Sequence, residues 1–319
     1  MRQYLKILFQ VLAASLIFVA CSKGDGDGSS KTDNSNANNT DKSQYATRLE
    51  VPRLKDGNAY QLLVKTTSQY GVNLMIEWDK VQRAQRWSCW VWTKENNVNP
   101  TNWSRNSWVN YTWGGVTWNG DPFQPDPELE ADYRTELSDY TGSGYNRGHI
   151  CASQDRISGP DVNGPTFYLS NMQPQIYSFN AGVWEKMEET VRSWAKTTTQ
   201  NDGKLYVCKG GTIYDVTIDG TVQTGVLTKN PGTGEVRSLR MPVPKYFFMA
   251  VLKETSSGLY SSIAFWAEHK PDYNTNLAPY AITIDELESR TGIDFFCNLP
   301  DHVEKATESS LDLSTWNLK

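Results

Sequence analysis

Short apolar runs rich in aromatic and β-branched residues recur along the chain and limit its fold more than any other feature. Gly, Pro, Asn or Ser residues separate one run from the next. The runs are residues 74–78, 87–93, 166–169, 205–208, 246–252 and 260–266. Short runs with this composition and spacing predict the strands of a mostly antiparallel sheet.

Two other segments have the marks of helices. After Asn180, apolar side chains recur at helical spacing and form one face; they are Val183, Trp184, Met187, Val191 and Trp194. In the segment TIDELESRTG, Thr283 and Glu286 form a capping box and Gly292 is a natural helix end. Because strands outnumber helices, we expect an α+β fold with a mostly antiparallel central sheet flanked by helices.

The first 20 residues are organised like an export signal. Arg2 and Lys6 precede the apolar run LFQVLAASLIFVA, which is short for a membrane span. Cys21, which follows Ala20, is placed as in a bacterial lipoprotein, whereas an ordinary signal peptide or an uncleaved anchor are the alternatives. We therefore expect a signal peptide over residues 1–20 and an exported protein, periplasmic or at the cell surface, held to the membrane by lipidated Cys21.

The segment that follows is rich in Gly, Ser, Asn and Asp and has no large apolar residue up to residue 43. Such a composition predicts a flexible tether, here over residues 21–48. No internal repeat or second linker follows, so residues 49–319 are expected to form one domain. The four remaining cysteines are far apart in sequence, which excludes CxxC motifs but leaves both disulfides and buried free thiols open; they are Cys89, Cys151, Cys208 and Cys297.

Seven of the twelve tryptophans lie within residues 87–118. The first three continue a predicted strand and are assigned to the core. The other four stand among Asn, Ser, Thr and Gly, and have two interpretations: a surface that stacks on sugar rings or bases, or an aromatic hairpin packed on the sheet. These four are Trp103, Trp108, Trp113 and Trp118.

The stretch SGYNRGHICASQDR places His149 between Arg147 and Arg156 in a chain with three histidines. An imidazole with a pKa of about 6.5 can take a proton from water near neutral pH, and two cations attract an anion. For Arg156, an ion pair with a nearby acid is as good an interpretation as a phosphate contact. His269 and His302 lack such neighbours, so we assign them structural or surface roles.

A second stretch, FYLSNMQPQIYSFNAGVWEKMEE, supplies oxygen ligands. Asn180 stands at the start of the predicted helix, either as its N-cap or as a neutral metal ligand, and Glu188 lies two turns further on. Mg²⁺ prefers oxygen ligands and often takes only one or two from the protein. With His149 as the base, such an ion suits hydrolysis of a phosphodiester.

The two stretches together resemble the DNA/RNA non-specific endonuclease family, which has a ββα-metal, or His-Me finger, active site. YNRGHICASQDR, LSNMQPQ and NAGVW carry the resemblance, which extends over about residues 73–305. It implies an endonuclease that hydrolyses the phosphodiester bonds of DNA and RNA without sequence preference and leaves 5′-phosphate ends. It further implies Mg²⁺ as the cofactor, with Mn²⁺ as a substitute, and leaves a homodimer open.

The resemblance also implies a role for each of five residues. His149 would be the general base and Asn180 the direct protein ligand of the metal. Glu188 would hold metal-bound waters, and Asn171 would orient water or substrate. Arg147 would contact phosphate or support the site.

Two positions depart from the family pattern. Asn146 stands where the motif usually has an aspartate, so the site has one negative charge fewer. The family also commonly has an arginine within the segment that reads VTWNGDPFQPDP here, and this segment contains none. Two outcomes follow for the missing arginine: Arg105 or Arg147 compensates for it, or turnover is lower.

The charge balance argues against a nucleic-acid enzyme. A formal net charge of −5 lacks the basic excess that is normal for proteins that bind a polyanion. The tryptophan-rich segment Trp103–Trp118 supplies the alternative, which is a surface-anchored glycan- or nucleic-acid-binding protein with a tryptophan-rich face and a relic nuclease site.

Overall fold

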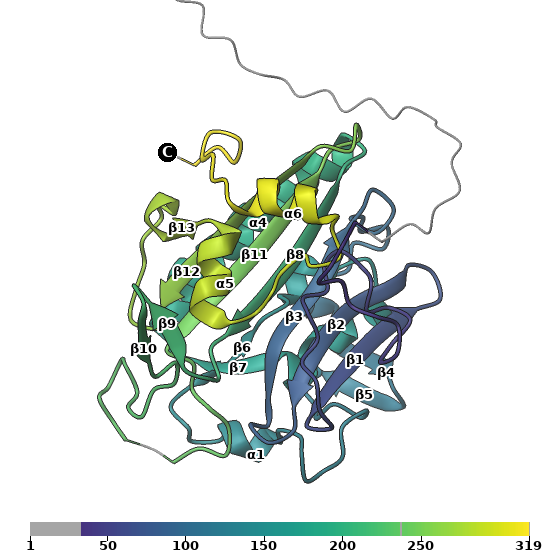
Figure 1. Ribbon diagram of the computed structural model, residues 1–319. Helices are drawn as coiled ribbons and strands as arrows, with labels where there is room; N and C mark the ends of the chain where they lie inside the picture. Colours follow the sequence, from purple (N-terminus) through teal and green to yellow (C-terminus); the bar gives the residue numbers. More distant parts are fainter. Residues whose placement is uncertain (1–32, 237, 319) are drawn as a thin grey trace, which may run out of the picture. The chain divides into compact units, whose positions relative to one another are not determined.

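The computed structural model describes residues 33–236 and 238–318 (Figure 1). From Asp33 onward the chain forms one compact unit. The predicted signal peptide and Cys21 lie outside the described residues. Of the helices in the described part, none combines the length and the apolar character that a membrane crossing requires.

A seven-stranded sheet forms the centre of this unit, and each strand is antiparallel to its neighbours. Its order is β1-β2-β3-β8-β11-β12-β13. The strands are β1 Tyr60–Thr67, β2 Gly71–Asp79, β3 Ala84–Trp92, β8 Lys204–Gly211, β11 Tyr246–Glu254, β12 Tyr260–Glu268 and β13 Ala281–Ile282. The predicted α+β class with a mostly antiparallel sheet is thereby confirmed.

Helices cover both faces of this sheet. Figure 1 shows α5 (Ile284–Thr291) and α6 (Asp301–Glu308) in front of β11 and β12, and α4 (Glu185–Gln200) behind the sheet. Phe247, Met249 and Val251 of β11 join the core on the α4 side, whereas the residues between them join the core under α5. Because both faces are buried, the central strands are continuous apolar runs rather than alternating ones.

Smaller elements surround the sheet. The strand pairs are β4 (Val109–Trp113) with β5 (Val116–Asn119), β6 (Asn146–His149) with β7 (Met172–Gln175), and β9 (Val216–Ile218) with β10 (Thr221–Gln223). The short helices are α1 Leu137–Tyr140, α2 Pro160–Asn163 and α3 Tyr177–Phe179. The single helical turns are η1 Arg105–Trp108, η2 Ser153–Asp155, η3 Gly164–Phe167, η4 Leu169–Asn171, η5 Asn180–Trp184 and η6 Ala278–Tyr280.

The structure confirms five of the six predicted strand runs and corrects the sixth. Residues 166–169 lie in the turns η3 and η4 instead of a strand. The run is buried, but the Thr166 hydroxyl bonds to the carbonyl oxygen of Asn163 at 2.6 Å and stabilises a turn. A short apolar run indicates that a segment is buried, but a buried segment can be a turn as well as a strand.

Both predicted helices are present. The Thr283 hydroxyl accepts the backbone N–H of Glu286 at 3.1 Å, and Gly292 ends α5 with a left-handed φ of +64°. The apolar face that was predicted after Asn180 packs on the sheet from η5 and α4.

The described part of the predicted tether is packed instead of flexible. Asn34 and Asn36 hydrogen-bond to the C-terminal segment. Asn38 is buried, and its amide bonds to the carbonyl oxygens of Ala46 and Pro52 and the N–H of Leu54, at 3.2, 3.0 and 2.9 Å. The tether prediction over residues 21–48 is therefore wrong for residues 33–48, and the compact unit begins at Asp33 instead of residue 49. Composition missed this because buried amides, not apolar side chains, hold the segment.

The four cysteines in the described residues are free thiols, and all four are buried. Cys89 and Cys208 are direct cross-strand partners on β3 and β8. Of the two possibilities that the sequence left open, the structure has the buried free thiols.

Replacing Asn38 tests whether the N-terminal segment is part of the folded unit. Asn38→Ala leaves three buried backbone groups without their partner, so we expect the free energy of unfolding to fall by roughly 2–3 kcal/mol. Asn39→Ala is the matched control because the neighbouring side chain is exposed. Urea denaturation followed by far-UV circular dichroism measures both variants. Equal stabilities would show that this segment contributes nothing to the fold.

Candidate active site

Two short strands and a helix converge at His149. His149 ends β6, where it pairs with Met172 of β7. The chain then continues through α3 and η5 into α4. The indole N–H of Trp184 donates to the backbone carbonyl oxygen of His149 at 3.2 Å and joins the strand to the start of the helix. This is a β–β–α arrangement, as the resemblance implies.

Aromatic side chains hold the partly buried ring of His149. Its centroid lies 5.6 Å from that of Phe123 and 5.1 Å from that of Phe167, which meets it edge-on. Its Nε2 atom is buried and has no hydrogen-bond partner among the described residues. Burial, with the nearby charges of Arg105 and Arg147, lowers the pKa of His149 to about 3. At neutral pH the ring is therefore uncharged and has a free nitrogen.

The two arginines that act on His149 come from different segments. The exposed guanidinium of Arg147 stacks 4.0 Å from the centroid of Phe123. Arg105, in η1, lies 5.7 Å from the centroid of Phe167 and forms an ion pair with Asp121. The structure thus brings both arginines that were expected to compensate for the missing family residue close to one histidine.

Arg156 does not belong to this group. It is 2% exposed, and its guanidinium donates to the carbonyl oxygen of Val91 at 3.1 Å beside the rings of Trp90 and Trp92. A phosphate cannot reach it, so that interpretation is wrong.

The tryptophan-rich segment packs against Phe167, which contacts the ring of His149. Trp103 and Trp108 are buried, and both indole N–H groups donate to Asn163 Oδ1, at 3.2 and 2.8 Å. Trp108 also contacts Phe167 at 6.2 Å between ring centroids, and Phe167 contacts His149. The packed interpretation thus holds for Trp103 and Trp108, which join a core with Phe167 apart from the central sheet. Trp113 and Trp118 are only partly buried.

Asn180 is the first residue of η5, a single π-helical turn. Its backbone is already helical and its side chain caps nothing, so the N-cap interpretation is wrong. The side chain is partly exposed and has no hydrogen-bond partner among the described residues. The turn is fixed by Asp272, whose carbonyl oxygen accepts the N–H of Val183 at 2.8 Å and would lie 2.0 Å from a Cβ placed on Gly182.

Glu188 lies in a buried cluster of charges that the sequence analysis did not identify. Lys209 Nζ is 3.1 Å from Asp155 Oδ2 and 3.8 Å from Glu188 Oε1, and Arg192 lies 3.0 Å from Asp155 and 4.0 Å from Glu188. Burial raises the pKa of Glu188 to about 7, against the opposing charge of Lys209. The signal in the sequence is a lysine inside the apolar run LYVCKGG.

Asn171 does not have its predicted role. Its side chain is 0% exposed, and all of its hydrogen-bonding capacity is used within the protein. The oxygen accepts from the Ser88 hydroxyl and the Cys151 N–H, and the nitrogen donates to the carbonyl oxygens of Cys151 and Thr166, at 2.8–3.1 Å. Asn171 therefore joins the segments around His149 and touches neither water nor substrate.

The other two histidines are where the sequence analysis placed them. His269 is buried, accepts the N–H of Ile176 at 2.9 Å and lies 2.8 Å from the carbonyl oxygen of Pro244, and burial lowers its pKa to about 4. His302 is exposed and lies 2.8 Å from Asp33.

The donor atoms at this site fit a hard divalent cation. Asn180 offers an amide oxygen without a partner, and the Oε1 atom of Glu188 is buried without a hydrogen bond. Oxygen donors of this kind, few in number and one of them partly exposed, suit Mg²⁺ or Mn²⁺. Asn180 and Glu188 are thus the residues that would hold such an ion and its water shell.

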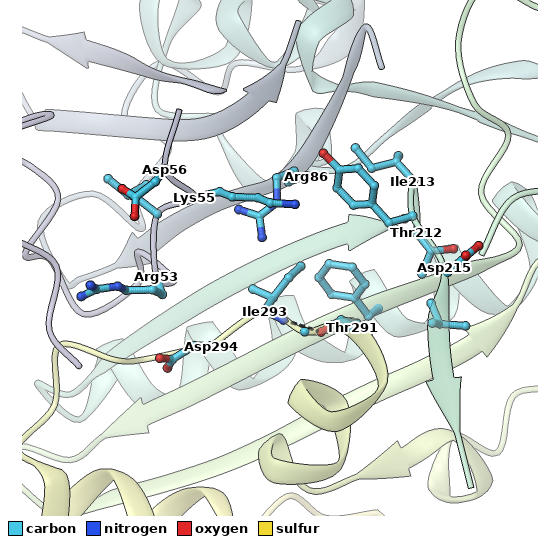
Figure 2. A pocket seen from close by; sticks show the side chains of 16 residues that line it. Arg53, Lys55, Asp56, Arg86, Thr212, Ile213, Asp215, Thr291, Ile293 and Asp294 are labelled. Atoms are coloured by element: carbon cyan, nitrogen blue, oxygen red, sulfur yellow. Dashed lines mark hydrogen bonds between the residues drawn. The ribbon is translucent and has the colours of Figure 1, made fainter. Parts of the chain in front are cut away.

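A cavity of 480 Å³ lies on the other face of the sheet and is separate from this site. Figure 2 shows Arg53 and Lys55 on one side of it, Arg86 of β3 above, and Ile293 and Asp294 from the segment after α5. None of the residues described above for the site around His149 lines it.

Two asparagine variants separate a structural role from a site role. Asn171→Ala leaves several buried groups without a partner, so we expect the free energy of unfolding to fall by roughly 3–4 kcal/mol. Asn180→Ala removes a side chain without a protein partner, and we expect a change within about 0.5 kcal/mol. Urea denaturation measures both. Equal losses would contradict the assignment of Asn171 to the structure.

Several known proteins are similar to this chain. A nuclease from Nostoc sp. is 30% identical over 198 residues, which cover 59% of this chain and 64% of the relative. Human mitochondrial endonuclease G is 28% identical over 178 residues, which cover 54% and 56%. The chain therefore spans less than two thirds of the length of each. The structure of EndoG in its complex with EndoGI has a TM-score of 0.59 at 22% identity, over 74% of this chain and 86% of that one, which shows a common fold.

The sequence profile of one family matches most of the folded unit. This profile, described as DNA/RNA non-specific endonuclease, covers residues 57–302. The match includes the β6–β7 strands, the helix α4 and the central sheet. With the ββα geometry around His149, it establishes that the chain belongs to the DNA/RNA non-specific endonuclease family.

Proposed function

We propose that this protein is a Mg²⁺-dependent endonuclease that hydrolyses phosphodiester bonds of DNA and RNA without sequence preference and leaves 5′-phosphate ends. Membership of the family supports the class of reaction. The observation that carries the proposal is the free Nε2 atom of His149, which lies between two arginines on a strand joined to the helix that follows Asn180.

His149 is the general base in this proposal. Its neutral ring accepts a proton from water at Nε2, the water oxygen attacks phosphorus, and the bond to the 3′-oxygen breaks. A group with a pKa near 3 is a weak base. A phosphate bound between Arg105 and Arg147 offsets their charges, so the pKa of His149 rises when substrate binds and proton transfer becomes easier.

Arg105 and Arg147 bind the scissile phosphate and stabilise the charge that develops on it. Both contacts are to the backbone of the nucleic acid, which carries no sequence information. A site built from such contacts accepts DNA and RNA alike. It also reconciles a net charge of −5 with a polyanionic substrate, since the cations are concentrated at the site.

The metal-holding residues act at the other side of the phosphate. When bound, Mg²⁺ or Mn²⁺ stabilises charge on the phosphate and on the leaving oxygen. Asn180 would hold the ion and Glu188 would orient its water shell. Lys209 and Arg192 favour the ionised form of Glu188 and oppose the effect of burial, which raises its pKa to about 7.

Buried tryptophans weigh against the alternative function. A glycan-binding face needs exposed rings, but Trp103 and Trp108 are buried and bonded to Asn163. Export and membrane attachment through Cys21, and a homodimer, remain part of the proposal on the strength of the sequence and the family.

A comparison of two histidine variants tests the assignment of the base. His149→Ala should lower plasmid and RNA cleavage in Mg²⁺ by roughly 100-fold or more, because the general base is lost. His302→Ala is the matched control on an exposed histidine and should retain full activity. EDTA should abolish cleavage by the unsubstituted protein and by His302→Ala. End-labelling of their products should find 5′-phosphates. Intact plasmid and RNA after incubation of the folded, unsubstituted protein with Mg²⁺ or Mn²⁺ would favour a binding protein.

The buried lysine should set the acid limit of activity. Activity needs ionised Glu188, so kcat/KM should fall as the pH drops through its pKa of about 7. Lys209→Met removes the charge that lowers this pKa, so the fall should move to higher pH. Lys204→Met, on the exposed end of the same strand, should leave the profile unchanged. An acid limb that does not move in Lys209→Met would disconnect Glu188 from the reaction.

A further inference from the structure

A group of carboxylates lies where α5 meets α6, on the face of the sheet opposite α4 and His149. Asp285 and Glu288 lie one turn apart on α5, and Glu308 is the last residue of α6. Each contributes an oxygen, and these oxygens lie within 4.8 Å of one another. In the described part of the chain, no other trio of acidic, histidine or cysteine side chains comes this close.

Glu308 differs from an ordinary surface carboxylate because it is buried and one of its oxygens has no hydrogen-bond partner among the described residues. It is 3% exposed, and its Oε1 atom is buried without a hydrogen-bond partner in the described part of the chain. Burying a carboxylate costs several kcal/mol unless a cation or several N–H groups compensate for the lost water. One carboxylate oxygen of Glu308 lies within 4.8 Å of oxygens of Asp285 and Glu288, and no donor among the described residues reaches Oε1.

The arginine of α5 does not neutralise this group of carboxylates. Arg290 of α5 pairs with Glu286 at 2.8 Å, on another side of the helix. No ion pair joins Asp285, Glu288 or Glu308 to a cation within residues 33–236 and 238–318. Glu288 accepts a single N–H, that of Phe295, at 2.7 Å.

Two further carboxylates increase the negative charge. Glu304 and Asp294 share one neutral donor, the amide nitrogen of Asn36, at 2.7 and 3.2 Å. Burial and mutual repulsion raise the pKa of Glu308 to about 10, of Glu288 to about 8 and of Glu304 to about 7. The group therefore has a strong affinity for positive charge, which either protons or a metal ion can satisfy.

We propose that Asp285, Glu288 and Glu308 form a structural Ca²⁺ site that joins α5 to α6. All of the donors are oxygens, which suits Ca²⁺, whereas zinc sites usually contain histidine or cysteine. Ca²⁺ takes several carboxylates from the protein, whereas Mg²⁺ usually keeps most of its waters and takes only one or two, so three carboxylates this close together suit Ca²⁺ better. Asp285 is exposed, which leaves room for the waters that complete a Ca²⁺ shell.

The ion would join two short helices that each pack on the sheet. The two helices have eight residues each and are separated by residues 292–300. The Ser262 hydroxyl bonds to the carbonyl oxygen of Thr307 at 2.8 Å and holds α6 to β12. Beyond α6, Trp316 packs against Trp194 of α4 at 4.7 Å, so the position of α6 also sets the path of the C-terminal segment.

Thermal unfolding of the purified chain, freed of metal with EDTA, tests the proposal. Saturating CaCl₂ should raise Tm by on the order of 5 °C, and MgCl₂ by clearly less. Glu308→Gln and Glu288→Gln should lose this gain, and Glu308→Gln in EDTA should be at least as stable as the unsubstituted chain because a buried charge is gone. Glu286→Gln, on the same helix, should keep the gain. Terbium luminescence, sensitised by tryptophan, measures binding directly on the same variants.

The same experiment distinguishes this Ca²⁺ site from the metal site at Asn180. Asn180→Ala should retain the full Ca²⁺-dependent rise, because its ion is a different one. An equal rise in the unsubstituted chain and in Glu308→Gln would overturn the proposal. So would a Tm that changes with pH between 7 and 10 but not with Ca²⁺, since protons would then neutralise the group.

Discussion

Lys209 is a fully buried cation on β8, in the middle of the sheet, and the site is organised around its neutralisation. A buried ammonium group is tolerated only with carboxylates in direct contact. Asp155 reaches it from the turn that follows β6, and Glu188 reaches it from α4. Satisfying one charge thus requires the central strand, the strand of His149 and the helix after Asn180 to come together. The same lysine determines where these elements meet and the ionisation of Glu188.

A second constraint, which is apolar, positions the ring of His149. The tryptophan-rich hairpin packs on Phe167, and Phe167 with Phe123 encloses the ring of His149. The ring is thereby fixed without a hydrogen bond to its Nε2 atom, which stays available for a proton. A polar clamp would hold the ring equally well but would occupy that atom. The unusual density of tryptophan in one segment is explained by this packing.

The sequence predicted the sheet and the helices that follow Asn180 and Thr283, because these depend on local patterns. It could not predict that residues 33–48 are packed, since their partners lie more than 240 residues away in the C-terminal segment. Asn171 was given a site role from its place in the second motif, and a phosphate contact was one of two interpretations of Arg156, but burial turns both side chains inward. The sequence did not identify Lys209, because Asp155 and Glu188, which neutralise it, are far from it in the sequence.

The bond between Val183 and Asp272 joins positions that are far apart in the chain. During synthesis, the turn that carries Asn180 emerges long before the carbonyl group that fixes it. The nascent polypeptide therefore has its histidine and its ligand residues but lacks the backbone support that sets their geometry. The turn therefore reaches its final geometry only after the ribosome has added Asp272.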